Sequence, residues 1–131
     1  MLPEPFLGLV DRADGLPSSE YFTGGAQIAA TVARENDPLM RGMAKHFSVT
    51  HNQGPILVPT DFVGKTEILA TFDREKTLKN GVANGTERLA GTPCVLRTHC
   101  GKGEVILCTF SPQFRVQQES TFKILFNALF A

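Results

Sequence analysis

The last stretch of the chain constrains its fold more than any other part of the sequence. It reads GKGEVILCTFSPQFRVQQESTFKILFNALF from residue 101 to residue 130. Within it, the run 105–108 is apolar at every position, which is typical of a strand buried on both faces of a sheet. A second β-rich run, 93–100, precedes it across the Gly-Lys-Gly segment 101–103, and such a pair indicates a hairpin. The sequence therefore predicts a β-hairpin whose second strand is a central strand.

A helical pattern follows, from about residue 121 to residue 130. Its apolar residues recur at the spacing of one helix face; they are Phe122, Leu125, Phe126 and Leu129. Ser120 or Thr121 is suited to the N-cap of this helix. Further apolar residues at 124, 128 and 130 widen the face beyond one stripe. We therefore expect an amphipathic helix that needs cover on more than one side.

Shorter elements are expected upstream. Strands are predicted at 25–33, 46–52, 56–58 and 66–72, where β-branched and aromatic residues alternate or run together. Asp37 is a good N-cap, Pro38 suits the first helical position and Gly42 suits the end of a short helix. Residues 73–92 are polar and glycine-rich, and they predict a long exposed loop. A loop of that length is often functional or an interaction site.

This order of elements predicts a single α+β domain within the 131 residues. We expect a mixed, largely antiparallel β-sheet with the C-terminal amphipathic helix packed on it. Residues 1–24 are rich in proline and glycine and lack periodicity, so they are expected to form an extended arm. The domain proper is predicted to be 25–131.

The charge balance argues against two classes of partner. Thirteen basic and thirteen acidic residues cancel, and basic and aromatic residues do not interleave on a face, so no nucleic-acid partner is expected. No apolar run approaches the roughly 20 residues that a membrane span needs, and the N-terminal stretch has no basic region typical of a signal peptide. We therefore expect no membrane partner and a cytoplasmic location.

The cysteines and histidines do not form a recognisable site. Cys94, Cys100 and Cys108 are odd in number and lack a familiar spacing, which favours reduced thiols. His46 and His51 are five residues apart and point to opposite faces of a continuous strand. Neither Cys-x-x-Cys nor His-x-x-x-His occurs, so no metal and no cofactor are expected.

Gln113 and Arg115 are the candidate binding residues. They follow the predicted strand 105–108 at its carboxyl end, where ligands of open α/β sheets bind. Arg115 could hold a carboxylate with two parallel hydrogen bonds. The structural alternative is that Arg115 pairs with Glu119 or another nearby acid and only fixes the loop.

Residues 101–130 resemble the closing strand and helix of a glutamine-amidotransferase-like domain with a flavodoxin-like fold, of the kind attached to the C-terminus of some zinc carboxypeptidases. The matching segments are 101–103, 105–108, 112–115, 121–123 and 126–129. Looser likeness extends upstream to about residue 22, and a similar order occurs in trehalose-utilisation-like proteins. The half of the domain that carries the nucleophilic cysteine, and the peptidase domain, have no counterpart here. The resemblance leaves a periplasmic or secreted location open.

These features favour a non-catalytic binding or interaction module that resembles a truncated amidotransferase-like domain. Its small-molecule ligand is not indicated by any motif. The apolar strand and helix would lack cover without the missing half, which predicts a homodimer, with arm or strand exchange as one means. A small cysteine-dependent hydrolase or amidase, with a fast-reacting thiol such as Cys100, is the alternative. A gene fragment with no independent role is a third hypothesis.

Overall fold

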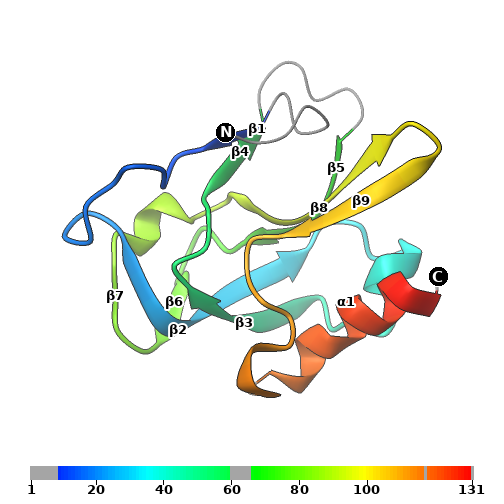
Figure 1. The fold of residues 1–131 in the computed structure, drawn as a ribbon. Helices are drawn as coiled ribbons and strands as arrows, with labels where there is room; N and C mark the ends of the chain where they lie inside the picture. The colour runs from blue at the N-terminus through cyan, green and yellow to red at the C-terminus, as the bar shows by residue number, and fades with distance from the viewer. Residues whose placement is uncertain (1–8, 60–65, 117, 131) are drawn as a thin grey trace.

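The computed structural model describes residues 9–59, 66–116 and 118–130 and shows an α+β fold, as the sequence predicts (Figure 1). The strands are β1 (Leu9–Asp11), β2 (Phe22–Val32), β3 (His46–Asn52), β4 (Leu57–Pro59), β5 (Thr66–Phe72), β6 (Leu78–Asn80), β7 (Ala83–Asn84), β8 (Pro93–Cys100) and β9 (Gly103–Cys108). The helices are the 3-10 turns η2 (Pro38–Met40), η3 (Thr86–Arg88) and η4 (Phe114–Val116), and the α-helix α1 (Glu119–Phe130).

One seven-stranded sheet organises the described residues. Its main order is β3-β2-β5-β8-β9, and β6 and β7 also pair with β2. Strands β1 and β4 form a separate two-stranded ribbon. Every pairing among the described residues is antiparallel, so the sheet shows no parallel part there.

The β8–β9 hairpin confirms one prediction and corrects another. Cys100 pairs with Gly103 across a turn in which Gly101 has a φ of 60°, a left-handed conformation that glycine adopts without strain. However, among the described strands β9 lies at an edge and not in the centre. Its first three residues are exposed and its last three are half-buried. The apolar run 105–108 predicted a neighbour on both sides, and the described residues supply only β8.

Each face of the sheet is covered by a different layer. The main core lies on the side of α1 and η2, where Ile124 and Leu39 pack with residues of β2, β3 and β5 such as Ile28 and Phe72. On the other side, the β1–β4 ribbon contributes Leu9 and Leu57 to a small cluster with Leu96.

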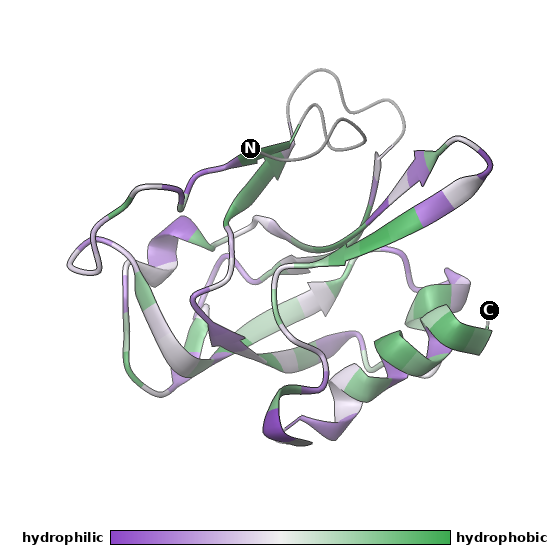
Figure 2. Cartoon of the chain, viewed as in Figure 1, coloured by the Kyte–Doolittle hydropathy of each residue, from purple (hydrophilic) through white to green (hydrophobic). Residues whose placement is uncertain are grey.

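Helix α1 packs on the rest of the fold through one narrow face. Its side chains Thr121 and Ile124 are buried, and Asn127 Nδ2 donates to the carbonyl oxygens of Leu39 (2.8 Å) and Arg41 (2.9 Å) in and beside η2. The outward residues are exposed: Leu125, Phe126, Leu129 and Phe130, by 37%, 54%, 68% and 84%. The green colour along α1 in Figure 2 shows how apolar the helix is. The second cover that the apolar pattern requires is therefore not provided by the described residues.

The predicted N-cap of this helix is wrong. The helix begins at Glu119, and the Thr121 hydroxyl donates to the Gln118 (2.8 Å) and Pro112 (2.5 Å) carbonyl oxygens instead of accepting from the first turn. The short helix predicted at Asp37 is confirmed: Asp37 Oδ1 accepts from the Leu39 amide at 3.0 Å, and η2 starts with Pro38.

The segment 73–92 is not a structureless loop. It contains β6, β7 and η3, and Leu89 and Thr77 are buried within it. The two strands are only three and two residues long and mostly exposed, so they carry no alternating pattern for a sequence-based prediction. Of the predicted arm, residues 9–24 include β1 and the first residues of β2, and residues 1–8 lie outside the described residues.

Candidate functional site

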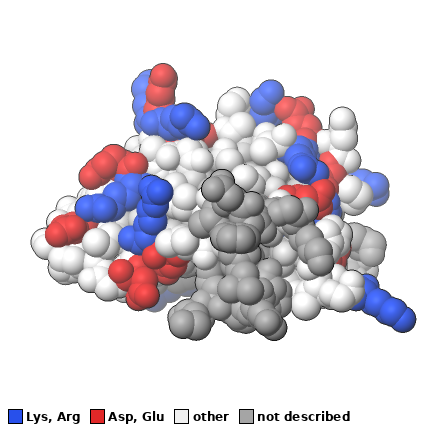
Figure 3. Space-filling view, turned by 90° about the horizontal axis from the view of Figure 1, so that it is seen from above, with Lys and Arg blue, Asp and Glu red and all other residues white. Residues whose placement is uncertain are grey.

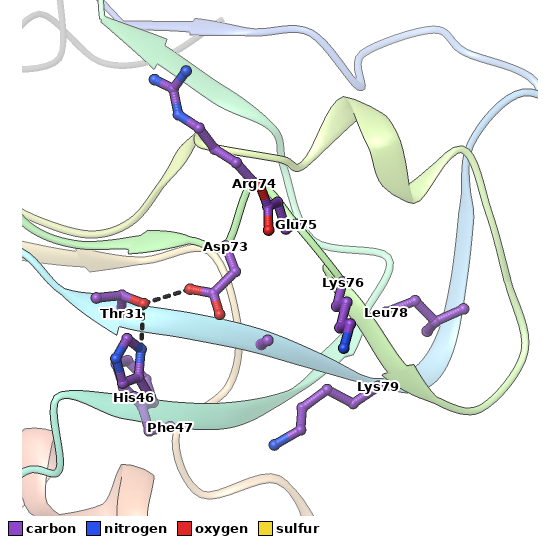
Figure 4. A pocket seen from close by; sticks show the side chains of 10 residues that line it. Thr31, His46, Phe47, Asp73, Arg74, Glu75, Lys76, Leu78 and Lys79 are labelled. Atoms are coloured by element: carbon purple, nitrogen blue, oxygen red, sulfur yellow. Dashed lines mark hydrogen bonds between the residues drawn. The ribbon is translucent and has the colours of Figure 1, made fainter.

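A pocket of about 910 Å³ opens beside β2, β3 and the segment that connects β5 to β6 (Figure 4). Its wall combines charged, polar and apolar side chains from these three places and from β6. The lining residues are Ala29, Thr31, His46, Phe47, Asp73, Arg74, Glu75, Lys76, Leu78 and Lys79.

Backbone hydrogen bonds to β2 hold the connecting segment in place. The Asp73 amide donates to the Ala29 carbonyl oxygen at 3.0 Å, and the Ala29 amide donates to the Thr77 carbonyl oxygen at 2.8 Å. The Thr77 hydroxyl closes the turn by donating to the Asp73 carbonyl oxygen at 2.7 Å. Lys76 has a φ of 52°, which turns the chain sharply. The pocket is therefore built on a fixed turn.

A chain of three polar side chains lies in the pocket. Thr31 and His46 are register partners in the β2–β3 ladder, and Asp73 follows directly after β5. The Thr31 hydroxyl donates to Asp73 Oδ1, because a carboxylate can only accept. Thr31 Oγ1, 3.0 Å from His46 Nδ1, must then accept from it. The proton of His46 therefore lies on Nδ1, and Nε2 remains for a ligand.

Charges of both signs surround this chain of hydrogen bonds. Lys79 Nζ donates to Ser48 Oγ at 2.9 Å, which holds the ammonium beside β3. Lys76 and Glu75 also line the pocket. The Arg74 guanidinium is turned away from the Thr31–His46–Asp73 group in Figure 4, and its side chain lies against Gly91. The pocket can therefore meet a ligand with an ammonium, a carboxylate or a hydrogen-bond donor.

A separate ion-pair network is structural. Arg97 on β8 contacts Asp37 Oδ2 at 2.5 Å and Glu67 Oε2 at 2.8 Å, which joins η2 to β5. Burial alone would raise the pKa of Asp37, but the hydrogen bonds from Arg97 and from the Leu39 amide outweigh it and lower that pKa. The hydrogen bond from Arg97 also lowers the pKa of Glu67. All three groups are occupied by one another, so this network is not our candidate site.

His51 is buried away from the pocket. Its Nδ1 lies 2.8 Å from Thr23 Oγ1, whereas Nε2 has no hydrogen-bond partner among the described residues. Burial lowers the pKa of His51 to about 4, so the ring is neutral at pH 7. The buried Thr109 Oγ1 is likewise without a partner in that part of the chain. As the sequence predicts, His46 and His51 lie on opposite sides, one exposed and one buried.

The cysteines do not favour nucleophilic catalysis. Cys94 is fully buried in β8, and burial raises the pKa of its thiol well above the usual value. Burial also raises the pKa of Cys108 to about 11. Both thiols are therefore protonated at neutral pH, whereas a nucleophile needs the thiolate. Cys100 is exposed at the end of β8. No group of three His, Cys, Asp or Glu residues suited to a metal occurs within the described ranges.

Gln113 and Arg115 do not meet the pocket residues. Both are exposed, and Arg115 lies in η4 with a φ of 48° and its guanidinium 5.4 Å from the centre of the Phe114 ring. Phe114 lines a smaller pocket of about 230 Å³ together with Ser111 and Thr109. Neither Gln113 nor Arg115 is among the residues that line this smaller pocket, and their role in binding stays a prediction. No ion pair between Arg115 and Glu119 occurs among the described side chains.

Sequence reasoning missed Thr31 and Asp73. The one usable signal was the prediction that segment 73–92 is functional, because the first part of that segment lines the pocket. Charged side chains elsewhere lie in small mixed groups, with Lys and Arg beside Asp and Glu on the face in Figure 3. In the described part of the chain, no helix has the length and apolar character required to span a bilayer.

Comparison with known proteins identifies the fold but no activity. No family model and no curated protein matches the chain. Among solved structures, a putative ThuA-like protein from Bacteroides uniformis aligns with a TM-score of 0.51 and 14% sequence identity. The alignment covers 79% of this chain and 42% of the other. ThuA-like proteins have a glutamine-amidotransferase-like fold, so the resemblance inferred from residues 101–130 is supported at the level of the fold.

Proposed function

We propose that the chain is a non-catalytic binding module that holds a small ligand in the pocket of Thr31, His46 and Asp73. The observation that carries this proposal is the hydrogen-bonded chain from His46 through Thr31 to Asp73. It fixes the tautomer of a histidine on a pocket wall and leaves one ring nitrogen for a ligand. Binding sites are typically concave surfaces with a few oriented polar groups of this kind.

The charges of the pocket favour a small zwitterion. Asp73 and Glu75 supply carboxylates for an ammonium group, whereas Lys76 and Lys79 supply ammonium groups for a carboxylate. A purely anionic or purely cationic ligand would place its charge near like charges of the wall, which is unfavourable. Leu78 and Ala29 offer apolar contact for the body of the ligand.

Binding fits this site better than catalysis. A nucleophilic hydroxyl needs a neighbouring histidine or similar base that takes up its proton. His46 instead donates to the Thr31 oxygen, and the Thr31 hydroxyl proton is held by Asp73, so His46 is not placed as the base for Thr31. The cysteine-dependent alternative rests on Cys100, since the other two thiols have raised pKa values. Titration of the native protein with a thiol reagent tests it: labelling of Cys100 no faster than that of a free cysteine would contradict a catalytic thiol.

The likeness to part of a larger domain supports an accessory role. The chain spans 42% of the length of the ThuA-like protein that it matches. Together with the resemblance of residues 101–130 to the domain attached to zinc carboxypeptidases, this suggests a module that acts beside another protein. Three free thiols support a cytoplasmic setting.

Calorimetric titration with probes of different charge tests the proposal. We expect binding of small zwitterions such as serine or glutamate, with weaker binding of succinate, phosphate and putrescine. Asp73→Asn removes the carboxylate that accepts from Thr31, and we expect it to weaken binding about tenfold or more, the equivalent of about 1.4 kcal/mol.

Lys79→Gln tests the opposite charge, and Lys102→Gln in the distant β8–β9 turn is its matched control. We expect Lys79→Gln to weaken binding of the zwitterion, because the ligand carboxylate loses its ammonium partner, and we expect Lys102→Gln to leave the affinity unchanged. Recovery of unaltered ligand by mass spectrometry is expected; conversion of the ligand would contradict a non-catalytic module. Equal binding by the Asp73→Asn variant would place the ligand elsewhere.

A further inference from the structure

The outer edge of β9 presents unpaired backbone groups. The Thr109 amide donates to the Cys94 carbonyl oxygen at 3.0 Å, which fixes the phase of the β8–β9 ladder. Because hydrogen-bonded and non-hydrogen-bonded pairs alternate in an antiparallel ladder, residues 105 and 107 also direct their amide and carbonyl groups toward β8. Glu104, Ile106 and Cys108 direct theirs away from it, toward the side on which the sheet has no further strand among the described residues.

Within the described ranges, this edge lacks the usual protection against pairing. Natural edge strands carry charged residues or proline, or are covered by another segment. Residues 105–108 are all apolar, as the green part of β9 beyond the hairpin turn in Figure 2 shows, and Val105 is 37% exposed. The nearest charge on the strand, Glu104, is drawn toward Arg97 at 3.7 Å.

Both faces of β9 are already parts of packed layers. Ile106 and Cys108 pack against the main core, and Leu107 packs against the smaller cluster on the other face. A strand added beside β9 would therefore continue both layers, and it would supply the neighbour that the apolar sequence predicts.

We propose that the partner is a second copy of this chain, paired through antiparallel β9 strands about a two-fold axis at Ile106. In this register Ile106 faces Ile106 of the second copy, Glu104 faces Cys108, and Val105 faces Leu107. The three outward-directed residues of each strand then meet as hydrogen-bonded pairs. No like charges face each other, and apolar side chains meet apolar ones. A strand whose outward backbone groups and side chains are complementary to those of an antiparallel copy of itself is suited to an isologous dimer.

Sedimentation equilibrium at micromolar concentration is the first test. We expect the full chain to be a dimer and Val105→Lys to weaken the dimer at least about tenfold, because it places an ammonium against Leu107 of the second copy. Val82→Lys is the matched control, since Val82 is 74% exposed outside β9, and it should stay dimeric. A wild-type mass equal to one chain up to about 100 μM would overturn the proposal, whatever other protein occupies the edge.

Disulfide trapping tests the register without relying on a destabilised variant. In a Cys100→Ser background, Glu104→Cys should form a disulfide with Cys108 of a second copy, because directly opposed residues lie within the Cα separation that a disulfide spans. Lys102→Cys in the same background lies outside the paired region and should not link to Cys108. Peptide mapping distinguishes the two linkages. A dimer that resists Val105→Lys and lacks the 104–108 linkage would show that association uses another surface, such as α1.

Discussion

At the scale of single residues, Gly54 shows that a glycine can be required for a close backbone contact and not for a left-handed turn conformation. The segment 53–55 reads as a Gly-Pro break between two strands, but the left-handed residue is Gln53, with a φ of 51°. A Cβ on Gly54 would lie 2.0 Å from the Thr109 carbonyl oxygen and 2.8 Å from His51 Nε2. Gly54 is therefore needed for the close approach of this loop to the residues after β9.

Substitution of this glycine should be costly. We expect Gly54→Ala to lower the free energy of unfolding by about 1–3 kcal/mol, because backbone must move to make room for the methyl group. Gly103→Ala is the matched control, since its Cβ would meet nothing closer than 3.8 Å. Urea denaturation of both variants measures the difference. Equal stability of the two would show that the loop shifts freely.

The pocket could not be predicted residue by residue, for a physical reason. Thr31 stands at an unremarkable polar position of a strand, and Asp73 is the first residue after another strand. They meet only because β5 pairs with the end of β2, where Ala30 faces Phe72. This pairing joins segments that are about forty residues apart, and no local spacing encodes it.

At the scale of elements, the Arg97 network attaches η2 to the sheet. The side chains of Arg97 and Asp37 are only 15% and 7% exposed, so neither charge is well solvated without the other. Asp37 also caps η2 through the Leu39 amide. This one carboxylate therefore both starts a short helix and binds it to β8.

Loss of the arginine should destabilise the protein more than loss of a surface ion pair. We expect Arg97→Gln to lower the free energy of unfolding by about 3 kcal/mol, because it leaves Asp37 shielded and unpaired. Lys45→Gln breaks the exposed pair with Glu35 and should cost less than about 1 kcal/mol. Guanidinium denaturation distinguishes the two, and equal effects would contradict the structural role of the network.

Elements with a strong local pattern were predictable, whereas their environment was less so. The strands at 46–52 and 66–72 occur at the expected bounds, because their β-rich sequences reflect a buried face. The prediction that β9 is a central strand was wrong for the described sheet. An apolar run indicates that a strand is buried, but it does not indicate which segments bury it. The short strands β6 and β7 were missed because their stability comes from β2 and not from their own composition.

At the scale of the whole molecule, stability should depend on pH through titratable side chains that act over different pH ranges. His51 has a pKa of about 4 in the fold against an ordinary 6.5, so the unfolded chain takes up its proton first as the pH falls. The lowered pKa values of Asp37 and Glu67, whose ordinary values are 3.8 and 4.5, begin to matter as the pH falls toward those ordinary values, near the lower end of the His51 range. Acid should therefore act in two stages.

We expect the free energy of unfolding to fall by about 3 kcal/mol between pH 6.5 and pH 4 because of His51. Above pH 6.5 the His51 ring is uncharged in both the folded and the unfolded state, so it does not change the free energy of unfolding with pH. Below pH 4 the ring is protonated in both states, and the His51 effect levels off. Urea denaturation across this range measures it. Between pH 6.5 and about pH 5, the slope should disappear in His51→Gln and persist in His99→Gln, whose ring is exposed; an unchanged slope in His51→Gln would assign the dependence to other groups.

The length of β2 has a consequence for how the protein can assemble. This eleven-residue strand pairs with β3 along one edge, and along the other it meets β7, β6 and β5 in turn. Four segments drawn from across the chain thus depend on one template, and among the described strands β3, β6 and β7 have no other partner. The pairing on that side is complete only when all four segments have been made, so a nascent chain cannot finish it until residue 84 has left the ribosome.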